Sequence, residues 1–308
     1  MLESRIREFQ EALVERAQQF LPDEALDESS IAAFIETPRH WFAPRFPNGE
    51  PGLWREASDT LLEANLETLY ADQPYCIYHD ESGRALSTIS QPSLVLFMLH
   101  LLELKPGQRV FELGGGSGWN AAMMGRIVGP TGKVVSVETI DTLASNARQA
   151  IANCDLGNVS WISGDANQAI EDCASFDRGV FTASAWTLPS LFFDRIREGG
   201  ILLFVFDLDE SRDLLATLRK RDGRFISELH FPCRFVPAIG TCEAPEQDDS
   251  RESEHRFESW LSRIPVDIEA LDLQIVPASQ ASTSNQESYC FIRGDSAFIW
   301  SIPTEPQA

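Results

Sequence analysis

The sequence predicts an α/β fold with a doubly wound, mostly parallel sheet, preceded by N-terminal helices and followed by a small β-rich extension. Three observations lead to this prediction. The apolar run Val110–Leu113 enters a glycine cluster, and a helix-compatible segment follows it. Lys133–Glu138 has the composition of the next buried strand, and its acidic end lies about twenty residues past the glycines. Strand-like and helix-like segments then continue to alternate.

The glycine cluster is typical of a nucleotide-binding turn. Its alternating glycines form an E-x-G-x-G-x-G pattern that also holds a serine: Gly114, Gly116, Ser117 and Gly118. Glycines permit positive φ and let a ligand approach the backbone closely. The N–H groups at the start of the next helix then face that ligand. Glu138 stands at the spacing that suits a ribose hydroxyl. Counted from Gly114, the last glycine of the dinucleotide-binding pattern G-x-G-x-x-G would fall at Trp119, so that strict pattern is absent. The glycine pattern is instead similar to the S-adenosylmethionine loop of class I methyltransferases.

The segments before this loop are expected to be mainly helical. Apolar residues at helical spacing predict helices over Glu3–Phe20, Leu26–Glu36 and Ser58–Tyr70, and a buried helix over Ser93–Leu104. In the motif P-R-H-W-F-A-P, the adjacent Trp41 and Phe42 are expected to pack in the core.

Beyond the loop, the alternation predicts further elements. Helices are expected over Thr142–Asn153, Gln168–Cys173, Pro189–Arg197 and Leu214–Arg221. Strands are expected over Val159–Ile162, Arg178–Thr182, Ile201–Phe206 and Phe225–Phe235. In such sheets, ligands bind at the carboxyl ends of the strands.

The segment after residue 241 is expected to differ from the rest. Cys242–Glu254 is acidic and has no apolar period, which predicts a linker or a solvated loop. Tyr289–Ile292 and Ala297–Ile302 predict a β-hairpin, which packs on the main domain or forms a separate module. We therefore expect a cap (1–84), a methyltransferase domain (85–241), an acidic linker (242–256) and a β-rich extension (257–308). A chain truncated near Gly240 is expected to keep its fold.

Composition argues against several classes of function. With 25 basic and 47 acidic residues the formal net charge is −22, which disfavours a nucleic-acid substrate. No apolar run approaches the roughly 20 residues of a membrane span. The six cysteines form no C-x-x-C pair and the five histidines are scattered, so we expect no metal site and a reducing, cytoplasmic location.

Several short motifs along Pro38–Gly240 resemble those of protein-L-isoaspartate O-methyltransferases. The most specific are T-I-S-Q-P at Thr88–Pro92 and R-F-V-P at Arg234–Pro237, and P-R-H-W-F-A-P resembles that family's P-R-x-x-F-x-P. The resemblance implies a Rossmann-like class I methyltransferase fold with S-adenosyl-L-methionine as cofactor and S-adenosyl-L-homocysteine as product. It further implies methylation of L-isoaspartyl residues in damaged proteins or peptides, which is protein repair.

The resemblance also implies individual site residues. Ser90 matches the serine treated as the family's active-site residue, although a serine before a helix is usually a cap. Further matches imply cofactor contacts at Ser87, Thr88, Ile89, Gly114, Glu138, Asp165 and Ala166, with Glu138 on the ribose and Asp165 near the adenine; the glycine loop adds Gly116, Ser117 and Gly118. From residue type alone, the backbone of Val236 and Pro237 is expected to dock a peptide.

The chain departs from the family pattern beside the acceptor pocket. Leu86 and Ser87 replace the usual glycine and glutamine before T-I-S, and Phe204–Asp207 replaces a proline-valine-glycine turn. An alternative is therefore a pathway-specific carboxyl methyltransferase that acts on an Asp or C-terminal carboxylate of a ribosomal peptide. A third hypothesis is an adaptor that binds S-adenosylmethionine without turnover, which the intact T-I-S-Q-P disfavours.

Overall fold

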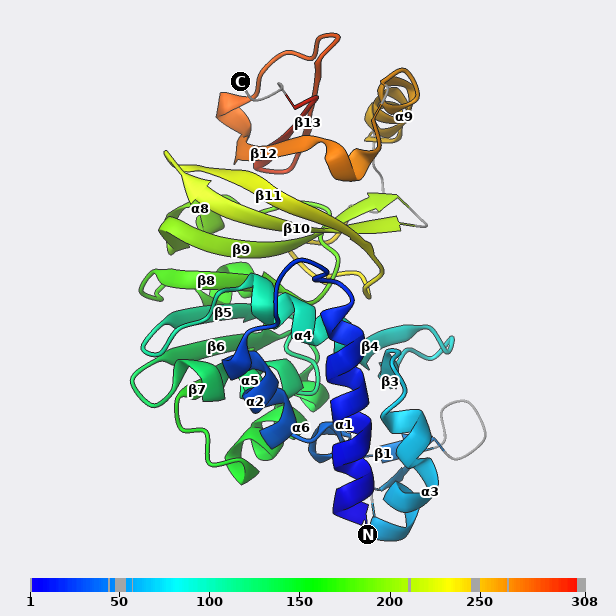
Figure 1. Ribbon diagram of the computed structural model, residues 1–308. Helices are drawn as coiled ribbons and strands as arrows, with labels where there is room; N and C mark the ends of the chain where they lie inside the picture. The colour runs from blue at the N-terminus through cyan, green and yellow to red at the C-terminus, as the bar shows by residue number, and fades with distance from the viewer. Residues whose placement is uncertain are drawn as a thin grey trace. The chain divides into compact units, whose positions relative to one another are not determined.

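The computed structural model describes residues 2–43, 45–47, 54–56, 58–209, 212–244, 250–264 and 266–303. The chain divides into two compact units, Met1–Gly164 and Asp165–Ala308. The strands around the glycine loop of the first unit pair in parallel, whereas most strand pairs of the second unit are antiparallel; Figure 1 labels most of these strands. None of the described helices is long and apolar enough to cross a membrane.

The first unit holds the parallel strands around the glycine loop. Strand β5 (Arg109–Leu113) pairs with β6 (Lys133–Glu138), and β6 pairs with β7 (Val159–Ser163), each in parallel. Helix α5 (Trp119–Val128) joins β5 to β6, and α6 (Asp141–Asn153) joins β6 to β7. Parallel strands joined by helices confirm the predicted α/β class.

Helices and two short hairpins precede this sheet. Helix α1 packs against α4, and α2 packs against α4 and α5. Eight residues of α4 are buried, as its apolar sequence predicts. The elements are α1 (Leu2–Gln18), α2 (Glu28–Glu36), η1 (Arg39–Phe42), β1 (Arg45–Pro47), β2 (Trp54–Glu56), α3 (Asp59–Leu69), β3 (Tyr75–His79), β4 (Ala85–Ile89) and α4 (Pro92–Leu101).

The prediction that Trp41 and Phe42 both pack in the core is half wrong. Phe42 is 1% exposed, but Trp41 is 49% exposed. Both belong to the single 3₁₀ turn η1, in which neighbouring side chains project about 120° apart, so one ring can be buried while the next is not. Pro44, the last residue of their motif, lies outside the described residues.

The second unit begins with a parallel pair and continues antiparallel. Strand β8 pairs in parallel with β9, which then pairs antiparallel with β10, and β10 with β11. The elements are α7 (Ala166–Ala169), β8 (Phe176–Phe181), α8 (Leu191–Arg195), β9 (Ile196–Asp209), β10 (Arg212–Arg221) and β11 (Arg224–Cys233).

The helix predicted over Leu214–Arg221 is wrong, because this segment lies in strand β10. Leu214, Leu215 and Ala216 are each at most 1% exposed, and β10 has a strand on both sides. A short apolar run buried on both faces has no period that separates a strand from a helix. Pairing with neighbouring strands decides the outcome.

The predicted C-terminal hairpin forms and extends the antiparallel sheet of this unit. Strands β13 (Ser288–Arg293) and β14 (Ser296–Ser301) pair, β14 pairs with β12 (Asp272–Pro277), and β12 pairs with β11. Residues 245–249 of the predicted acidic linker lie outside the described residues. Residues 250–256 of the linker belong to helix α9 (Ser250–Leu261). Two 3₁₀ turns flank β12, η2 (Ile268–Ala270) and η3 (Ala278–Gln280).

Aromatic side chains of the hairpin belong to the core of the second unit. The ring centroids of Phe298 and Phe206 are 4.9 Å apart, and Trp300 is fully buried. Arg293 is 3% exposed and donates a 2.6 Å hydrogen bond to the Asp207 carbonyl. Because of these contacts, we predict that a chain truncated near Gly240 loses part of this core.

Candidate active site

The glycine loop between β5 and α5 has the backbone that its sequence predicts. Gly114, Gly116 and Gly118 have φ angles of 84°, 53° and 86°, which residues with a Cβ rarely adopt. Gly118 is the N-cap of α5, and the Ser117 hydroxyl accepts a 3.2 Å hydrogen bond from the Trp119 N–H. The loop therefore depends on glycine at three alternating positions.

Glu138, at the end of β6, is tied to this loop. Its carboxylate accepts hydrogen bonds from the N–H groups of Gly116 at 2.8 Å and Ile140 at 2.9 Å. The side chain is 6% exposed, and burial raises the pKa of Glu138 above its ordinary value. A carboxylate has about four acceptor sites, so these two N–H donors and the Thr139 hydroxyl, which donates at 3.5 Å, leave capacity for a ligand hydroxyl.

A second buried acid, Glu112 of β5, lies beneath the loop. Glu112 is fully buried and accepts hydrogen bonds from the side chains of Asn120 at 2.8 Å and Ser136 at 2.5 Å. Burial raises the pKa of Glu112 to about 7, and the nearby Glu138 charge adds to the rise. The sequence analysis did not single out Glu112, because one acid in an apolar strand gives no sign of its partners.

Strand β4 lies against the glycine loop. A Cβ added to Gly116 would lie 3.1 Å from the Ser87 hydroxyl and 3.9 Å from the Thr88 carbonyl. Ser87 is buried, and Ile89 belongs to the core at 2% exposed. The structure thus brings Ser87 and Thr88 together with the glycine loop and Glu138.

Ser90 follows β4 and is half-buried. Its hydroxyl forms no hydrogen bond with any residue that the structure describes. Gln91 is the N-cap of α4, and Asp72 accepts hydrogen bonds from the Ser93 N–H at 3.0 Å and the Ser93 hydroxyl at 2.9 Å. Asp72 therefore does the work of a capping side chain, which leaves the Ser90 hydroxyl for another role.

Arg39 of the P-R-H-W-F-A-P motif fixes the backbone at Ser90. Its guanidinium donates hydrogen bonds to the carbonyls of Ile89 at 2.7 Å and Ser90 at 2.9 Å. Three more carbonyls, in the segment that leads from α3 to β3, accept from the same group: Leu69, Ala71 and Gln73. Arg39 is 1% exposed, and burial lowers its pKa to about 10. The motif predicted family membership but not this contact. Every residue has a backbone carbonyl, so the sequence does not show which five accept hydrogen bonds from Arg39.

The remaining predicted residues lie in the second unit. Asp165 is the N-cap of α7, which begins at Ala166, and its carboxylate accepts hydrogen bonds from the N–H of Thr241 at 2.7 Å and its hydroxyl at 2.8 Å. The Val236 carbonyl accepts a 2.9 Å hydrogen bond from the Ser184 N–H. This bond occupies one of the backbone groups predicted to dock a peptide, whereas the side chain of Pro237 is exposed.

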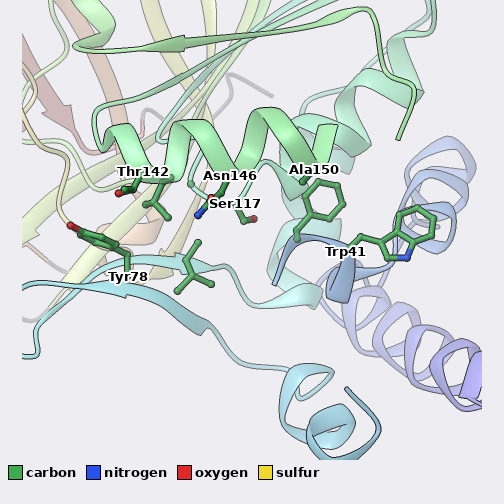
Figure 2. A pocket seen from close by; sticks show the side chains of 10 residues that line it. Trp41, Tyr78, Ser117, Thr142, Asn146 and Ala150 are labelled. Carbon is green, nitrogen blue, oxygen red and sulfur yellow. The ribbon is translucent and has the colours of Figure 1, made fainter. Parts of the chain in front are cut away.

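A cavity of about 170 Å³ opens beside the glycine loop in the first unit. Gly116 and Ser117 line it, together with residues of η1, β3 and α6. Figure 2 shows Thr142, Asn146 and Ala150 on α6, and Tyr78 and Trp41 lie on the same side of that helix as these residues. The sequence analysis did not anticipate this cavity, because its walls come from four separate segments.

A family model of protein-L-isoaspartate(D-aspartate) O-methyltransferases (PCMT) matches residues 58–243, more than half of the chain. The chain belongs to this family. Membership confirms the relationship inferred from the short motifs, and with it the predicted enzyme class, an S-adenosylmethionine-dependent methyltransferase.

Individual relatives agree with the family model. A protein-L-isoaspartate O-methyltransferase of Methanosarcina mazei is 28% identical over 238 residues, which are 77% of this chain and 86% of that protein. One from Methanothrix thermoacetophila is 37% identical over 171 residues, 56% of this chain and 77% of that protein.

Two solved structures share the fold. A protein-L-isoaspartate O-methyltransferase aligns with a TM-score of 0.64 at 22% identity, over 96% of this chain and 88% of that one. A beta-aspartate methyltransferase (PCMT) of Plasmodium falciparum, solved with S-adenosyl-L-homocysteine, aligns with a TM-score of 0.56 at 19% identity, over 74% of this chain and 97% of that one. The first alignment covers more of the chain than the family model does, so the C-terminal strands have counterparts in that structure.

Proposed function

We propose that this chain methylates the free carboxylate of L-isoaspartyl residues in damaged proteins and peptides, with S-adenosyl-L-methionine as the methyl donor. Membership of the PCMT family supports this function most directly. The T-I-S-Q-P strand beside the glycine loop adds local support, because Ser87 lies against Gly116 and Ser90 follows three residues later.

The residues of the glycine loop suit this cofactor. The three glycines with positive φ let the backbone approach a ligand, and Glu138 has acceptor capacity for ribose hydroxyls. Within the first unit, Ser87, Thr88 and Ile89 would form one wall of the cofactor site and Gly114–Gly118 its floor. When bound, S-adenosyl-L-methionine supplies an electrophilic methyl group on a positively charged sulfur.

The protein then needs to orient the acceptor and needs no general base. A carboxyl group has a reference pKa of about 4, so the isoaspartyl carboxylate is ionised at neutral pH. Orientation alone contributes about 7–11 kcal/mol to a well-aligned reaction. The Ser90 hydroxyl donates a hydrogen bond that fixes one carboxylate oxygen, and Arg39 fixes the backbone that carries Ser90.

We further propose that the substrate is a protein or peptide docked beside Val236 and Pro237, and not a nucleic acid or a membrane component. The net charge of −22 supports this choice. The six cysteines are all free, which supports a cytoplasmic location.

A methylation assay with two peptides tests the function. One peptide contains isoaspartate and its twin contains aspartate at the same position, and methyl ester is measured by mass spectrometry. We expect ester on the isoaspartyl peptide only. Ester on the aspartyl twin, or on the C-terminal carboxylate of both peptides, would instead indicate a dedicated peptide carboxyl methyltransferase.

A further inference from the structure

We infer that the cavity beside the glycine loop binds an uncharged side chain, aromatic or aliphatic, next to the isoaspartyl residue of the substrate peptide. The inference rests on the proposed function and adds a preference in sequence to it. Four observations support it: the uncharged lining, the size of the cavity, a β-bulge in its wall, and its position next to the glycine loop of the proposed active site.

None of the ten residues that line the cavity carries a charge. This contrasts with a chain in which 23% of residues are charged and the net charge is −22. Phe42 is among the lining residues, the Trp41 ring lies at one end, and the amide of Asn146 and the hydroxyl of Thr142 provide neutral polar groups (Figure 2). A charged group would lose water there without gaining an ionic partner, so the occupant is uncharged.

The size of the cavity suits one large side chain. Its volume of about 170 Å³ is close to that of an apolar cavity of roughly 150 Å³ that holds one benzene molecule. Trp41 is 49% exposed, so its ring has apolar surface that a bound side chain could cover. Phe, Leu or Met side chains match this volume and chemistry.

The wall contributed by β3 contains a β-bulge. Cys76 pairs with Thr88, but Tyr78 pairs with Ser87, so Ile77 is an extra residue on its strand. In a regular strand, successive side chains point to opposite faces. Bulges redirect side chains, and here both Ile77 and Tyr78 line the cavity.

The cavity adjoins the glycine loop of the proposed active site. Gly116 and Ser117 of the cofactor loop line it, and Tyr78 in its wall stands opposite Ser87, three residues before Ser90. One strand of the hairpin, β3, therefore lines the cavity, and the other, β4, leads to Ser90. A peptide held by its isoaspartyl carboxylate at Ser90 can therefore place a neighbouring side chain in the cavity.

The test measures the dissociation constants of matched isoaspartyl peptides by calorimetry in the presence of S-adenosyl-L-homocysteine. The peptides differ only at the residue on either side of the isoaspartate, which is Phe, Ser, Asp or Lys. We expect the Phe peptide to bind about tenfold more tightly than the Ser or Asp peptides, in line with the usual effect of a filled apolar pocket. Trp41→Ala should abolish that preference, whereas Ile292→Ala, which removes a similarly exposed apolar side chain far along the sequence, should not.

A charge introduced into the cavity provides the second arm. Asn146→Asp should weaken binding of the Asp peptide and strengthen binding of the Lys peptide. Asn153→Asp, the same change on the same helix outside the cavity, should do neither. In both cavity variants the affinity for S-adenosyl-L-homocysteine should stay within about twofold of the wild type, because neither Trp41 nor Asn146 is among the residues proposed to hold the cofactor.

The outcomes separate this inference from the proposed function. Equal affinities for the four peptides, or a large loss of cofactor affinity in Asn146→Asp, would overturn the side-chain pocket. If no isoaspartyl peptide is methylated although the Phe preference is present, the pocket stands and the proposed reaction fails.

Discussion

The strands of the two units differ in how they use their side chains and backbone. In the first unit, β5 ends in the glycine loop and β6 ends at Glu138, and the geometry there depends on single groups, such as the Gly116 N–H bonded to Glu138 at 2.8 Å. In the second unit, the C-terminal strands meet the sheet through broad aromatic contacts, such as Phe298 against Phe206 and the fully buried Trp300. Small changes in the first unit should therefore affect binding and turnover, whereas changes in the second should affect stability.

The largest effect should follow removal of the C-terminal strands. A chain ending at Gly240 loses Phe291, Phe298 and Trp300, and each buried aromatic contributes about 1.5–3 kcal/mol. Together these approach the roughly 5–15 kcal/mol that stabilise a typical domain, so the second unit should unfold. Circular dichroism and thermal melts measure this directly.

A milder pair of variants checks the same point in the full chain. Phe298→Ala should lower the free energy of unfolding by about 3–5 kcal/mol. Ile292→Ala, which is 53% exposed on the neighbouring strand, should change it by less than about 0.5 kcal/mol. A truncated chain that melts like the full-length protein would show that the extension is a separate module.

In the first unit, Ser90→Ala should lower kcat by roughly ten- to a thousandfold, the range expected when one preorganised donor is lost. Because Asp72 caps α4, the variant should lose little stability. Ser87→Ala is the matched control, and it should affect cofactor affinity more than kcat. Steady-state kinetics with an isoaspartyl peptide distinguish the two. Unchanged kcat in Ser90→Ala, with a lowered Tm, would indicate that Ser90 is only structural.

Glu112 should make stability depend on pH. Burial raises its pKa from 4.5 to about 7, so between these values the folded chain keeps a proton that the unfolded chain releases. The contribution of Glu112 to stability is therefore complete below about pH 4.5 and falls as the pH rises to about 7. Glu112→Gln removes this dependence. The free energy of unfolding of the variant, relative to that of the wild type, should therefore rise by up to about 3 kcal/mol between pH 4.5 and 7.5. Urea unfolding of both proteins at both pH values measures this change. If the variant and the wild type differ in free energy of unfolding by the same amount at both pH values, Glu112 is not the cause of the pH dependence.

Local signals were sufficient for the first unit. Gly114, Gly116 and Gly118 alternate within one short segment that directly joins their supporting strand and helix, so residue type and spacing predicted both the turn and its positive φ angles. Glu138 was found in the same way, because the acid lies at a fixed spacing beyond the loop.

Signals that depend on distant partners were missed. The β10 segment was taken for a helix because its strand pairing with β9 and β11 is not visible in its own residues. Arg39 and the cavity at Tyr78 were missed for a related reason. The five carbonyls that accept hydrogen bonds from Arg39 come from two segments, and the bulge depends on the opposite strand. Both features form only when the chain folds.

The most direct test of the cofactor site is a calorimetric titration of S-adenosyl-L-homocysteine into wild type, Glu138→Gln and Glu138→Ala. Loss of a hydrogen bond to a charged group costs about 1.5–3 kcal/mol, so Glu138→Ala should raise Kd roughly ten- to a hundredfold. Glu138→Gln keeps one acceptor oxygen and should lie between the two, and thermal melts establish that all three proteins are folded. Equal Kd values for three folded proteins would contradict the assignment of the cofactor to the glycine loop and Glu138.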